Sequence, residues 1–201
     1  WKRSEPVLIS DFTARPFLLE WCEPIAQRAV LDLGCGEGYF ARNLAKRGAE
    51  RIEGMDLSSE MIARAQEQEA EAPLGIQYSI GDAPQLGRFE SESFDLVVAV
   101  FLFNYLNCKA TAAAMAEIFR VLRPGGVFYP LDSYTGDQPR NTALSKYDAW
   151  RNYRWNHEVW WMEYYDLDIA QAMRDAGFEV DENGPAGRTD TTRNVIGYKR
   201  A

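Results

Sequence analysis

The sequence has few of the features that mark membrane, secreted or metal-binding proteins. None of its apolar runs approaches the ~20 residues that a helix needs to cross a bilayer. Nothing at its amino end is typical of a signal peptide. Its three cysteines are odd in number and widely spaced, which argues against a disulfide framework and against a zinc site. We therefore expect a cytoplasmic protein with reduced thiols, no metal ion and no membrane partner.

Basic residues are also scarce, because 22 Lys and Arg face 30 Asp and Glu for a formal charge of -8. Proteins that bind nucleic acid usually carry a basic face that neutralises phosphates, so no nucleic-acid partner is expected. Histidine occurs once, as His157. The 201 residues, of which 46% are hydrophobic, are enough for one domain with a sizeable core and too few for two ordinary domains.

Three alternating glycines follow a short apolar stretch near the amino end. Residues 30–33 are typical of a strand, Gly34, Gly36 and Gly38 come next, and a helical pattern begins directly afterwards. Glycine takes positive φ and has no Cβ, so such a turn lets the main chain approach a small polar ligand. Tight packing without a ligand is the alternative. Because Tyr39 stands where a dinucleotide fingerprint has its third glycine, the G-x-G-x-G spacing disfavours a nicotinamide oxidoreductase.

Acidic residues stand where further predicted strands end. Residues 51–55 lead into Asp56, about 20 residues past the glycines, where a carboxylate can accept both hydroxyls of a ribose. Residues 76–80 lead into Gly81-Asp82-Ala83, which offers a carboxylate to the exocyclic amine of adenine. A carboxylate is costly to bury without a partner, so we expect Asp56 and Asp82 to contact a ligand.

Helical patterns alternate with the predicted strands. The helices are expected at residues 37–47, 58–65, 111–122 and 168–176, the second capped by Ser58 and burying Met61. Residues 94–100 form a nearly continuous apolar run, as in a strand covered on both faces. The third helix should end at residues 123–126, before a strand at 127–129. This order predicts a doubly wound α/β fold, a mostly parallel sheet with helices on both faces.

Two more strands are predicted near the carboxyl end, at residues 178–180 and 194–198. The turn-rich residues 183–187 lie between them, so the two strands read as a hairpin-like pair. They bring the predicted sheet to seven strands.

The order of these motifs resembles the class I S-adenosylmethionine-dependent methyltransferases, in the small-molecule branch of types 11 and 25. VLDLGCGEG is similar to the first motif of that family, GMD to the acidic ribose-binding position and GDA to the adenine-binding turn. FDLVVAV is similar to the fourth strand, and LRPGG to the turn before the fifth. The resemblance runs from about Val30 to the carboxyl end. It implies a Rossmann-like fold with an antiparallel last strand, S-adenosylmethionine as cofactor and S-adenosylhomocysteine as product.

The resemblance also implies which residues contact the cofactor. Those expected around its amino-acid tail are Asp32, Gly34, Cys35, Gly36, Gly38, Val100 and Phe101. Those expected around its nucleoside are Asp56, Leu57, Asp82 and Ala83. Within these two groups, Asp32 is expected to orient the ammonium group and Asp56 to hold the ribose.

A sulfonium is an activated methyl donor, so the protein mainly has to align nucleophile, methyl carbon and sulfur in a site that excludes water. A general base is needed only for an acceptor that is protonated at working pH. The candidate catalytic residues are His157, Asn104, Asp132 and Tyr134. Asn104 stands where relatives often have a histidine, which puts a base at that position in doubt.

We expect residues 1–29 to form an amino-terminal helical cap and residues 30–201 the cofactor-binding domain. An aromatic insertion is expected at about 134–166, since four of the six tryptophans lie between Tyr147 and Tyr165. These side chains either cover the acceptor pocket or fill a local core or subunit contact.

The expected reaction is in-line methyl transfer to an oxygen or nitrogen of a small, planar or aromatic metabolite, by a monomer or homodimer. Two alternatives stay open. The first is a regulatory protein that binds the cofactor without catalysis. The second is a methyltransferase that acts on a protein or an RNA.

Overall fold

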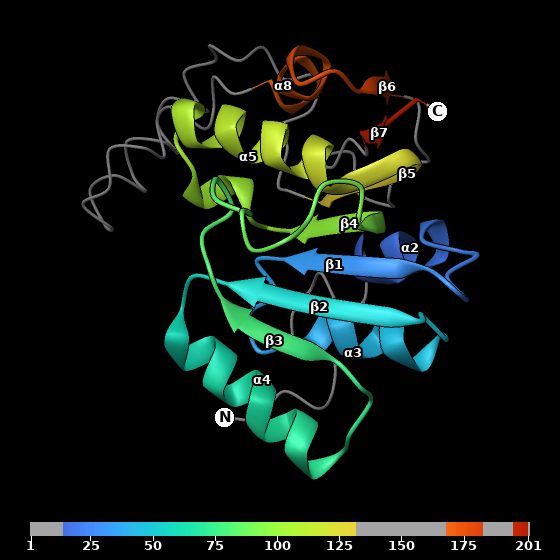
Figure 1. The fold of residues 1–201 in the computed structure, drawn as a ribbon, viewed down its shortest axis with the longest axis vertical. Coiled ribbons are helices and arrows are strands. Elements are labelled where there is room, and N and C mark those ends of the chain that lie inside the picture. Colours follow the sequence, from blue (N-terminus) through green and yellow to red (C-terminus); the bar gives the residue numbers. More distant parts are fainter. Residues whose placement is uncertain (1–13, 132–167, 183–194, 201) are drawn as a thin grey trace.

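The structure is a computed structural model that describes residues 14–131, 168–182 and 195–200. Figure 1 shows the strands side by side in one twisted sheet, with α4 beyond one edge and α8 near the other. The described helices and strands are, in chain order, α2 (Ala14–Trp21), β1 (Ala29–Leu33), α3 (Tyr39–Lys46), β2 (Arg51–Asp56), α4 (Ser59–Glu71), β3 (Gln77–Ile80), β4 (Phe94–Val100), the 3-10 helix η1 (Phe103–Tyr105), α5 (Cys108–Val121), β5 (Leu122–Leu131), α8 (Ile169–Asp175), β6 (Glu179–Asp181) and β7 (Ile196–Tyr198).

The described strands form a seven-stranded sheet in the order β3-β2-β1-β4-β5-β7-β6. Strands β1 to β5 pair in parallel, whereas β7 runs antiparallel to both β5 and β6. The predicted sheet and its antiparallel last strand are therefore confirmed. The chain moves outward from β1 to β3 and then returns to β4 on the other side of β1. The carboxyl ends of β1 and β4 thus form the switch point where open α/β sheets bind ligands.

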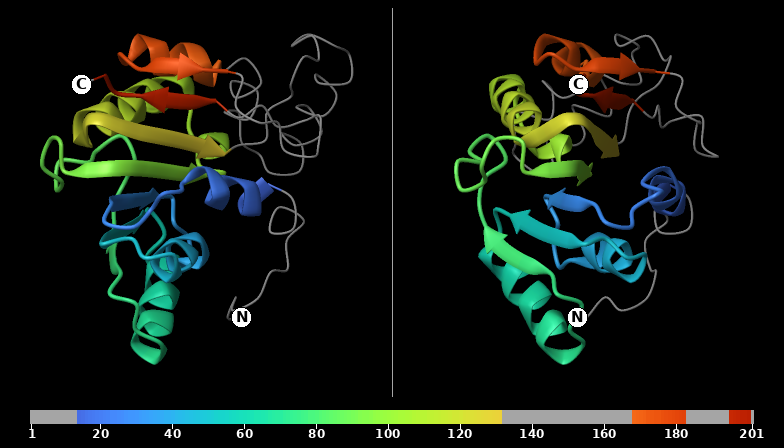
Figure 2. Two further views of the ribbon diagram at one scale, coloured as in Figure 1. Left: turned by 90° about the vertical axis from the view of Figure 1, so that its right-hand side faces the viewer. Right: turned by 45° about the vertical axis from the view of Figure 1, so that its right-hand side comes forward.

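Hydrophobic side chains cover both faces of the sheet. On one face α5 and α8 pack against Leu31 and Val97, and on the other α2 and α3 pack against Val30 and Val98. All five residues of β1 are buried, which explains the absence of polar alternation in this strand. Figure 2 shows α2 and α3 on the opposite side of the sheet from α5, and α4 lies along β2 and β3.

Polar side chains fix where three helices begin. Ser58 accepts the N–H of Met61 at the start of α4, as the sequence predicted. Asn107 does the same for Ala110 at the start of α5, and Asp168 for Gln171 at the start of α8. At α3 the cap is Gly38, whose φ of 83° lies in the left-handed region, so the helix begins at Tyr39. The predicted start at residue 37 was two residues early for this reason.

Two further predictions about α4 and α5 were wrong. Met61 is 36% exposed rather than buried, because it forms part of a cavity wall at the start of α4. Helix α5 ends at Val121 and not at residues 123–126, because Leu122 already pairs with Phe94 in β5. The strand register then shifts, and pairing resumes between Leu96 and Val127.

Glu69 ties the end of α4 to the turn that enters β3. Its Oε1 accepts the main-chain N–H groups of Leu74 and Gly75 at 2.5 and 2.7 Å. Its Oε2 accepts Nη1 of Arg42, from α3, at 2.8 Å. Charge-assisted bonds to main-chain groups are stronger than neutral ones, so Glu69 stabilises this end of the fold, away from the switch point.

No helix in the described ranges is long and apolar enough to cross a membrane. The three cysteines are free thiols, with Cys22 and Cys35 buried and Cys108 exposed. Burial raises the pKa of the Cys22 thiol to about 12, so this side chain stays protonated and apolar.

Candidate functional site

The glycine turn after β1 has the left-handed backbone that its sequence predicts. Gly34, Gly36 and Gly38 have φ values of 73°, 55° and 83°. The N–H groups of Gly34 and Cys35 both donate to the carbonyl oxygen of Met55, at 2.7 and 3.1 Å. The turn is therefore held against the end of β2, with its path set by main-chain hydrogen bonds.

The Asp56 carboxylate connects the glycine turn to the segment that follows β2. Its Oδ2 accepts the N–H of Gly36 at 2.8 Å, and its Oδ1 accepts the N–H of Ser58 at 2.9 Å. The carbonyl of Asp56 also accepts the N–H of Gly81 at 3.0 Å, so β3 ends beside it. Both carboxylate oxygens keep lone pairs for a further donor, because an ionised carboxylate can accept about four hydrogen bonds.

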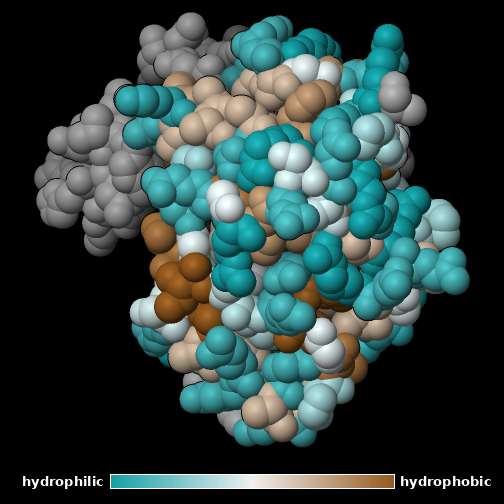
Figure 3. All heavy atoms as spheres, viewed as in Figure 1, coloured by the Kyte–Doolittle hydropathy of each residue, from teal (hydrophilic) through white to brown (hydrophobic). Residues whose placement is uncertain are grey.

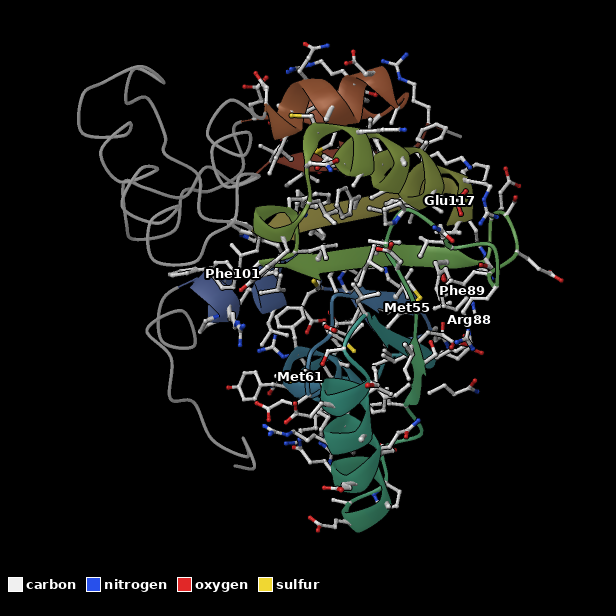
Figure 4. The ribbon with its side chains drawn as sticks, turned by 90° about the vertical axis from the view of Figure 1, so that its left-hand side faces the viewer. Met55, Met61, Arg88, Phe89, Phe101 and Glu117 are labelled. Carbon is white, nitrogen blue, oxygen red and sulfur yellow. The ribbon has the colours of Figure 1, made fainter. Side chains whose placement is uncertain are left out.

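A cavity of about 540 Å³ opens at the carboxyl ends of the strands, within the size range of small-ligand pockets. Its described lining residues are Leu33, Gly34, Gly36, Met55, Asp56, Leu57, Ser58, Met61, Gly81, Asp82, Ala83, Phe101, Leu102, Tyr105 and Leu106. Two carboxylates, those of Asp56 and Asp82, thus face a wall that is otherwise largely apolar. Figure 4 shows Met55 of β2, Met61 of α4 and Phe101 just after β4, which come from three separate parts of the chain.

The rim of the cavity exposes large apolar side chains. Leu57 is 69% exposed and Tyr105 is 64% exposed, and Ile80, which pairs with Asp56 at the end of β3, is 56% exposed. Figure 3 shows an apolar patch in brown on the left of the molecule, where β2 and β3 end and α4 begins. Exposed apolar surface of this kind is typical of a ligand-binding groove.

Asp32 lies in β1 directly behind the glycine turn and is only 1% exposed. Neither of its carboxylate oxygens has a hydrogen-bond partner among the described residues. Burial raises the pKa of Asp32 to about 7, an effect that the nearby Arg15 guanidinium and the main-chain N–H of Ala41 oppose. A buried carboxylate with so few donors is costly, and a bound cation would offset that cost.

Arg15 of α2 is a site residue that sequence reasoning missed. Its guanidinium lies over the rings of Tyr39 and Phe101, 5.7 Å from each centroid. It therefore places a positive charge close to both Asp32 and Phe101. No sequence signal could have found it, because only the packing of α2 against α3 brings Arg15 to the glycine turn.

The absence of a side chain has a different structural cause at Gly38 than at Gly36. A Cβ at Gly38 would stand 2.3 Å from the hydroxyl oxygen and 2.7 Å from Cζ of Tyr78, a residue of β3. A Cβ at Gly36 would meet nothing within 4 Å. The missing side chain of Gly38 thus makes room for a tyrosine, whereas that of Gly36 leaves open space at the cavity wall.

The structure brings most of the predicted cofactor residues together. Seven line the cavity, namely Gly34, Gly36, Asp56, Leu57, Asp82, Ala83 and Phe101. Four lie behind that lining, namely Asp32, Cys35, Gly38 and Val100, each of them partly or fully buried. Leu102, Tyr105 and Leu106 were missed as lining residues, because their irregular segment after β4 has no periodic pattern that indicates which side chains face a cavity.

Phe101 has a φ of 58°, which is strained for a residue with a side chain. Its N–H donates to the carbonyl of Leu131 at 2.6 Å, so the strained turn is tied to the end of β5. Such outliers are often found at ligand-binding sites.

The catalytic candidates are not tested by this geometry. Asp132, Tyr134 and His157 lie outside the residues that the structure describes, as do the aromatic insertion and residues 1–13 of the predicted amino-terminal cap. The backbone of Asn104 belongs to η1, between Phe103 and Tyr105, at the cavity side of β4. Within the described ranges, no group of three or more His, Cys, Asp and Glu side chains is arranged to hold a metal ion.

Comparison with known proteins connects this site to one family. A family model described as a methyltransferase domain matches residues 30–126, which include the glycine turn, Asp56, Asp82 and β4. The chain is 35% identical over 98 residues to the malonyl-(acyl-carrier protein) O-methyltransferase of Serratia marcescens, covering 49% of this chain and 35% of that protein. It spans about half or less of the length of the curated relatives that it matches.

Two solved structures share the fold. A methyltransferase from Methanosarcina mazei, described as S-adenosylmethionine-dependent, superposes with a TM-score of 0.67 at 21% identity, over 87% of this chain and 93% of that one. The phosphoethanolamine N-methyltransferase 2 of Haemonchus contortus, in complex with S-adenosylmethionine, superposes with a TM-score of 0.70 at 19% identity, over 94% of this chain and 52% of that one.

Proposed function

Because this chain belongs to the class I S-adenosylmethionine-dependent methyltransferases, we propose that it transfers a methyl group from S-adenosylmethionine to an oxygen or nitrogen of a small, planar or aromatic metabolite. The observation that carries the proposal is the Asp56 carboxylate. It is bound to the N–H groups of Gly36 and Ser58 and forms part of the wall of a cavity at the switch point of the sheet.

The nucleoside end of the cofactor fits the part of the cavity between β2 and β3. Asp56 offers its remaining lone pairs to the two ribose hydroxyls, and Asp82 offers a carboxylate to the adenine amine. Leu57 and Met61 supply apolar walls for the faces of the base. The open space above Gly36 leaves room for the ligand at the turn.

The amino-acid tail of the cofactor is a zwitterion, and two charged residues match it. Asp32 has two buried carboxylate oxygens without partners in the described part of the chain, which suits an ammonium group. Arg15 carries the opposite charge nearby, beside Phe101, which suits the carboxylate. A fixed pair of opposite charges therefore favours one direction of the tail over the reverse.

The bound cofactor supplies an electrophilic methyl group on a positively charged sulfur. The residues of this chain then have to orient it, keep water away and present the acceptor in line with the sulfur. Phe101, Leu102 and Tyr105 supply apolar walls where the segment after β4 meets the cavity. His157, Asn104, Asp132 and Tyr134 stay candidates for a base if the acceptor requires one.

The acceptor class is supported by two features. The acidic balance of the chain disfavours a nucleic-acid substrate. The described walls of the cavity are mostly apolar, which suits a planar ring better than a strongly charged polymer. The relative and the fold neighbour named above methylate different acceptors at oxygen and at nitrogen, so the shared domain leaves the methylated atom open.

The test combines calorimetry with S-adenosylhomocysteine and transfer of labelled methyl groups to a panel of phenols, catechols, quinols and aromatic amines, with proteins and RNA as further acceptors. Binding together with turnover of a panel member is the expected result. Binding without turnover of any small molecule, protein or RNA supports the regulatory alternative instead. Labelling of a protein or RNA alone supports the macromolecular alternative, and absence of binding refutes the proposal.

The raised pKa of Asp32 predicts a pH-dependent affinity. An ammonium group binds the ionised carboxylate, so below pH 7 the affinity for S-adenosylhomocysteine should fall, approaching about tenfold for each pH unit. Above pH 7 this group should add no further change, because Asp32 is then already ionised. Calorimetry between pH 5 and pH 8.5 measures the profile.

Two controls isolate Asp32 in this profile. The ligand 5′-methylthioadenosine has no ammonium group, so its affinity should not follow the same slope. An Asp32→Asn variant should flatten the profile for S-adenosylhomocysteine. Equal slopes for the two ligands would contradict the assignment of Asp32 to the ammonium group.

A further inference from the structure

The segment between β3 and β4, residues 81–93, contains no helix or strand, yet it forms one wall of the cavity. Its first three residues, Gly81, Asp82 and Ala83, line that wall. We name it the connecting segment. A loop of this length has to obtain its hydrogen bonds from elsewhere, so the groups that hold it also determine where Asp82 stands.

Two side chains of α5 hold the connecting segment by its main chain. Glu117 Oε2 accepts the N–H of Leu86 at 2.8 Å, and Arg120 Nη2 donates to the carbonyl of Leu86 at 2.9 Å. Arg120 Nη1 donates to the carbonyl of Phe89 at 3.0 Å and to Ser91 Oγ at 3.2 Å. Both polar main-chain groups of Leu86 are therefore bound to α5.

Glu117 and Arg120 also bind each other. Arg120 Nε donates to Glu117 Oε1 at 2.8 Å, and Arg120 Nη2 donates to Glu117 Oε2 at 3.0 Å. These bonds hold the pKa of Glu117 below its usual range, so the carboxylate is ionised near neutral pH. A planar guanidinium with all three nitrogens engaged is rigid, and lysine cannot reproduce this fork.

Leu86 is only four residues from Asp82, so the hydrogen bonds that hold Leu86 also restrict the position of Asp82. The N–H of Gln85 donates to the carbonyl of Asp82 at 2.9 Å, which closes a tight turn between the cavity and Leu86. Leu86 is fully buried and Ala83 is 5% exposed, so this turn is also packed into the core. Figure 4 shows Phe89 of the connecting segment and Glu117 of α5 on the same side of the view.

The far end of the connecting segment is bound to α5 as well. Glu92 and Ser93 donate their N–H groups to the carbonyls of Arg120 and Val121, at 3.0 and 2.8 Å. The chain just before α5 includes Tyr105 and Leu106, which line another part of the cavity. One helix thus sets the position of two walls.

We propose that Glu117 and Arg120 are positioning residues, which hold the connecting segment so that Asp82 and Ala83 meet the adenine of the cofactor. The inference rests on the proposed function and deepens it. Neither side chain lines the cavity, so their effect on binding acts through the main chain of Leu86. Without these hydrogen bonds, the connecting segment would have to become ordered when the cofactor binds. The entropic cost of that ordering would lower the affinity for the cofactor.

The test compares Glu117→Gln with Glu69→Gln. Both variants remove the charge of a carboxylate that accepts main-chain N–H groups and pairs with an arginine, but Glu69 holds the turn before β3, away from the cavity. Glu117→Gln should raise the dissociation constant of S-adenosylhomocysteine about tenfold, the equivalent of about 1.4 kcal/mol. Glu69→Gln should lower the melting temperature but change that constant less than about twofold.

Hydrogen exchange of peptides covering residues 81–93 gives a second readout. In Glu117→Gln these peptides should lose protection without ligand and regain it with saturating S-adenosylhomocysteine. Arg120→Lys should behave in the same way, which keeps the test decisive if one variant does not fold. An unchanged dissociation constant in either folded variant overturns the inference. If the wild-type protein does not bind S-adenosylhomocysteine, the proposed function fails before the inference is reached.

Discussion

Replacing Asp56 by alanine should weaken the binding of S-adenosylhomocysteine by about 30- to 100-fold, the equivalent of about 2 to 3 kcal/mol. The variant loses the proposed ribose contact, and it also loses the bonds that fix the glycine turn to the chain after β2. In these bonds the Asp56 carboxylate accepts the N–H of Gly36 at 2.8 Å and the N–H of Ser58 at 2.9 Å. Each is a hydrogen bond to a charged acceptor, the class whose removal costs most. Calorimetry with S-adenosylhomocysteine measures the loss.

Asp95→Ala is the matched control for this experiment. Asp95 is also a strand carboxylate that accepts a main-chain N–H, that of Ala29 at 2.8 Å, and it pairs with Arg123. It lies near the amino end of β4, whereas the cavity is at the carboxyl ends of the strands. The control should therefore lose stability and keep its affinity. Wild-type affinity in Asp56→Ala would remove the ribose assignment and the main support for the proposed function.

Gly38→Ala should lower the free energy of unfolding by about 2 to 4 kcal/mol. Part of the loss comes from a φ of 83°, which disfavours any side chain with a Cβ. The larger part comes from Tyr78, whose hydroxyl oxygen would stand 2.3 Å from the new methyl group. Because Tyr78 is half-buried between Gly38 and Gly54, its ring has little room to move. Urea denaturation measures the change.

Gly36→Ala is the control that measures the backbone strain alone, without a clash such as that between residue 38 and Tyr78. Its φ of 55° is also left-handed, but its Cβ would meet nothing within 4 Å, so it should cost only about 1 to 2 kcal/mol. Since Gly36 lines the cavity, its methyl group should weaken ligand binding more than it weakens the fold.

A double-mutant cycle tests the role of Tyr78 directly. Tyr78→Leu removes the ring and should recover part of the stability that Gly38→Ala loses, a coupling of the order expected for residues in contact. Equal destabilisation by Gly38→Ala and Gly36→Ala, together with no coupling to residue 78, would contradict the packing explanation.

The sequence alone determined the order of the elements and seven of the fifteen described residues that line the cavity. Strands covered on both faces need continuous apolar runs, and the ends of parallel strands meet at one edge of a sheet, so residues 30–33 and 94–100 and the acidic positions after the strands could be placed by pattern. The glycines that follow β1 were predicted on the same basis, because positive φ selects glycine locally.

The tertiary structure alone decided which distant residues share a contact. Arg15 reaches the glycine turn through the packing of α2, Tyr78 makes Gly38 a packing residue, and Glu117 holds a segment 31 residues away in sequence. Met61 lies outside the expected core because it lines the cavity. None of these contacts can be recognised from the residues next to it in sequence, because the hydrophobic period and the turn residues report only on the local backbone. Their partners are chosen only when the sheet order and helix packing bring separate segments together.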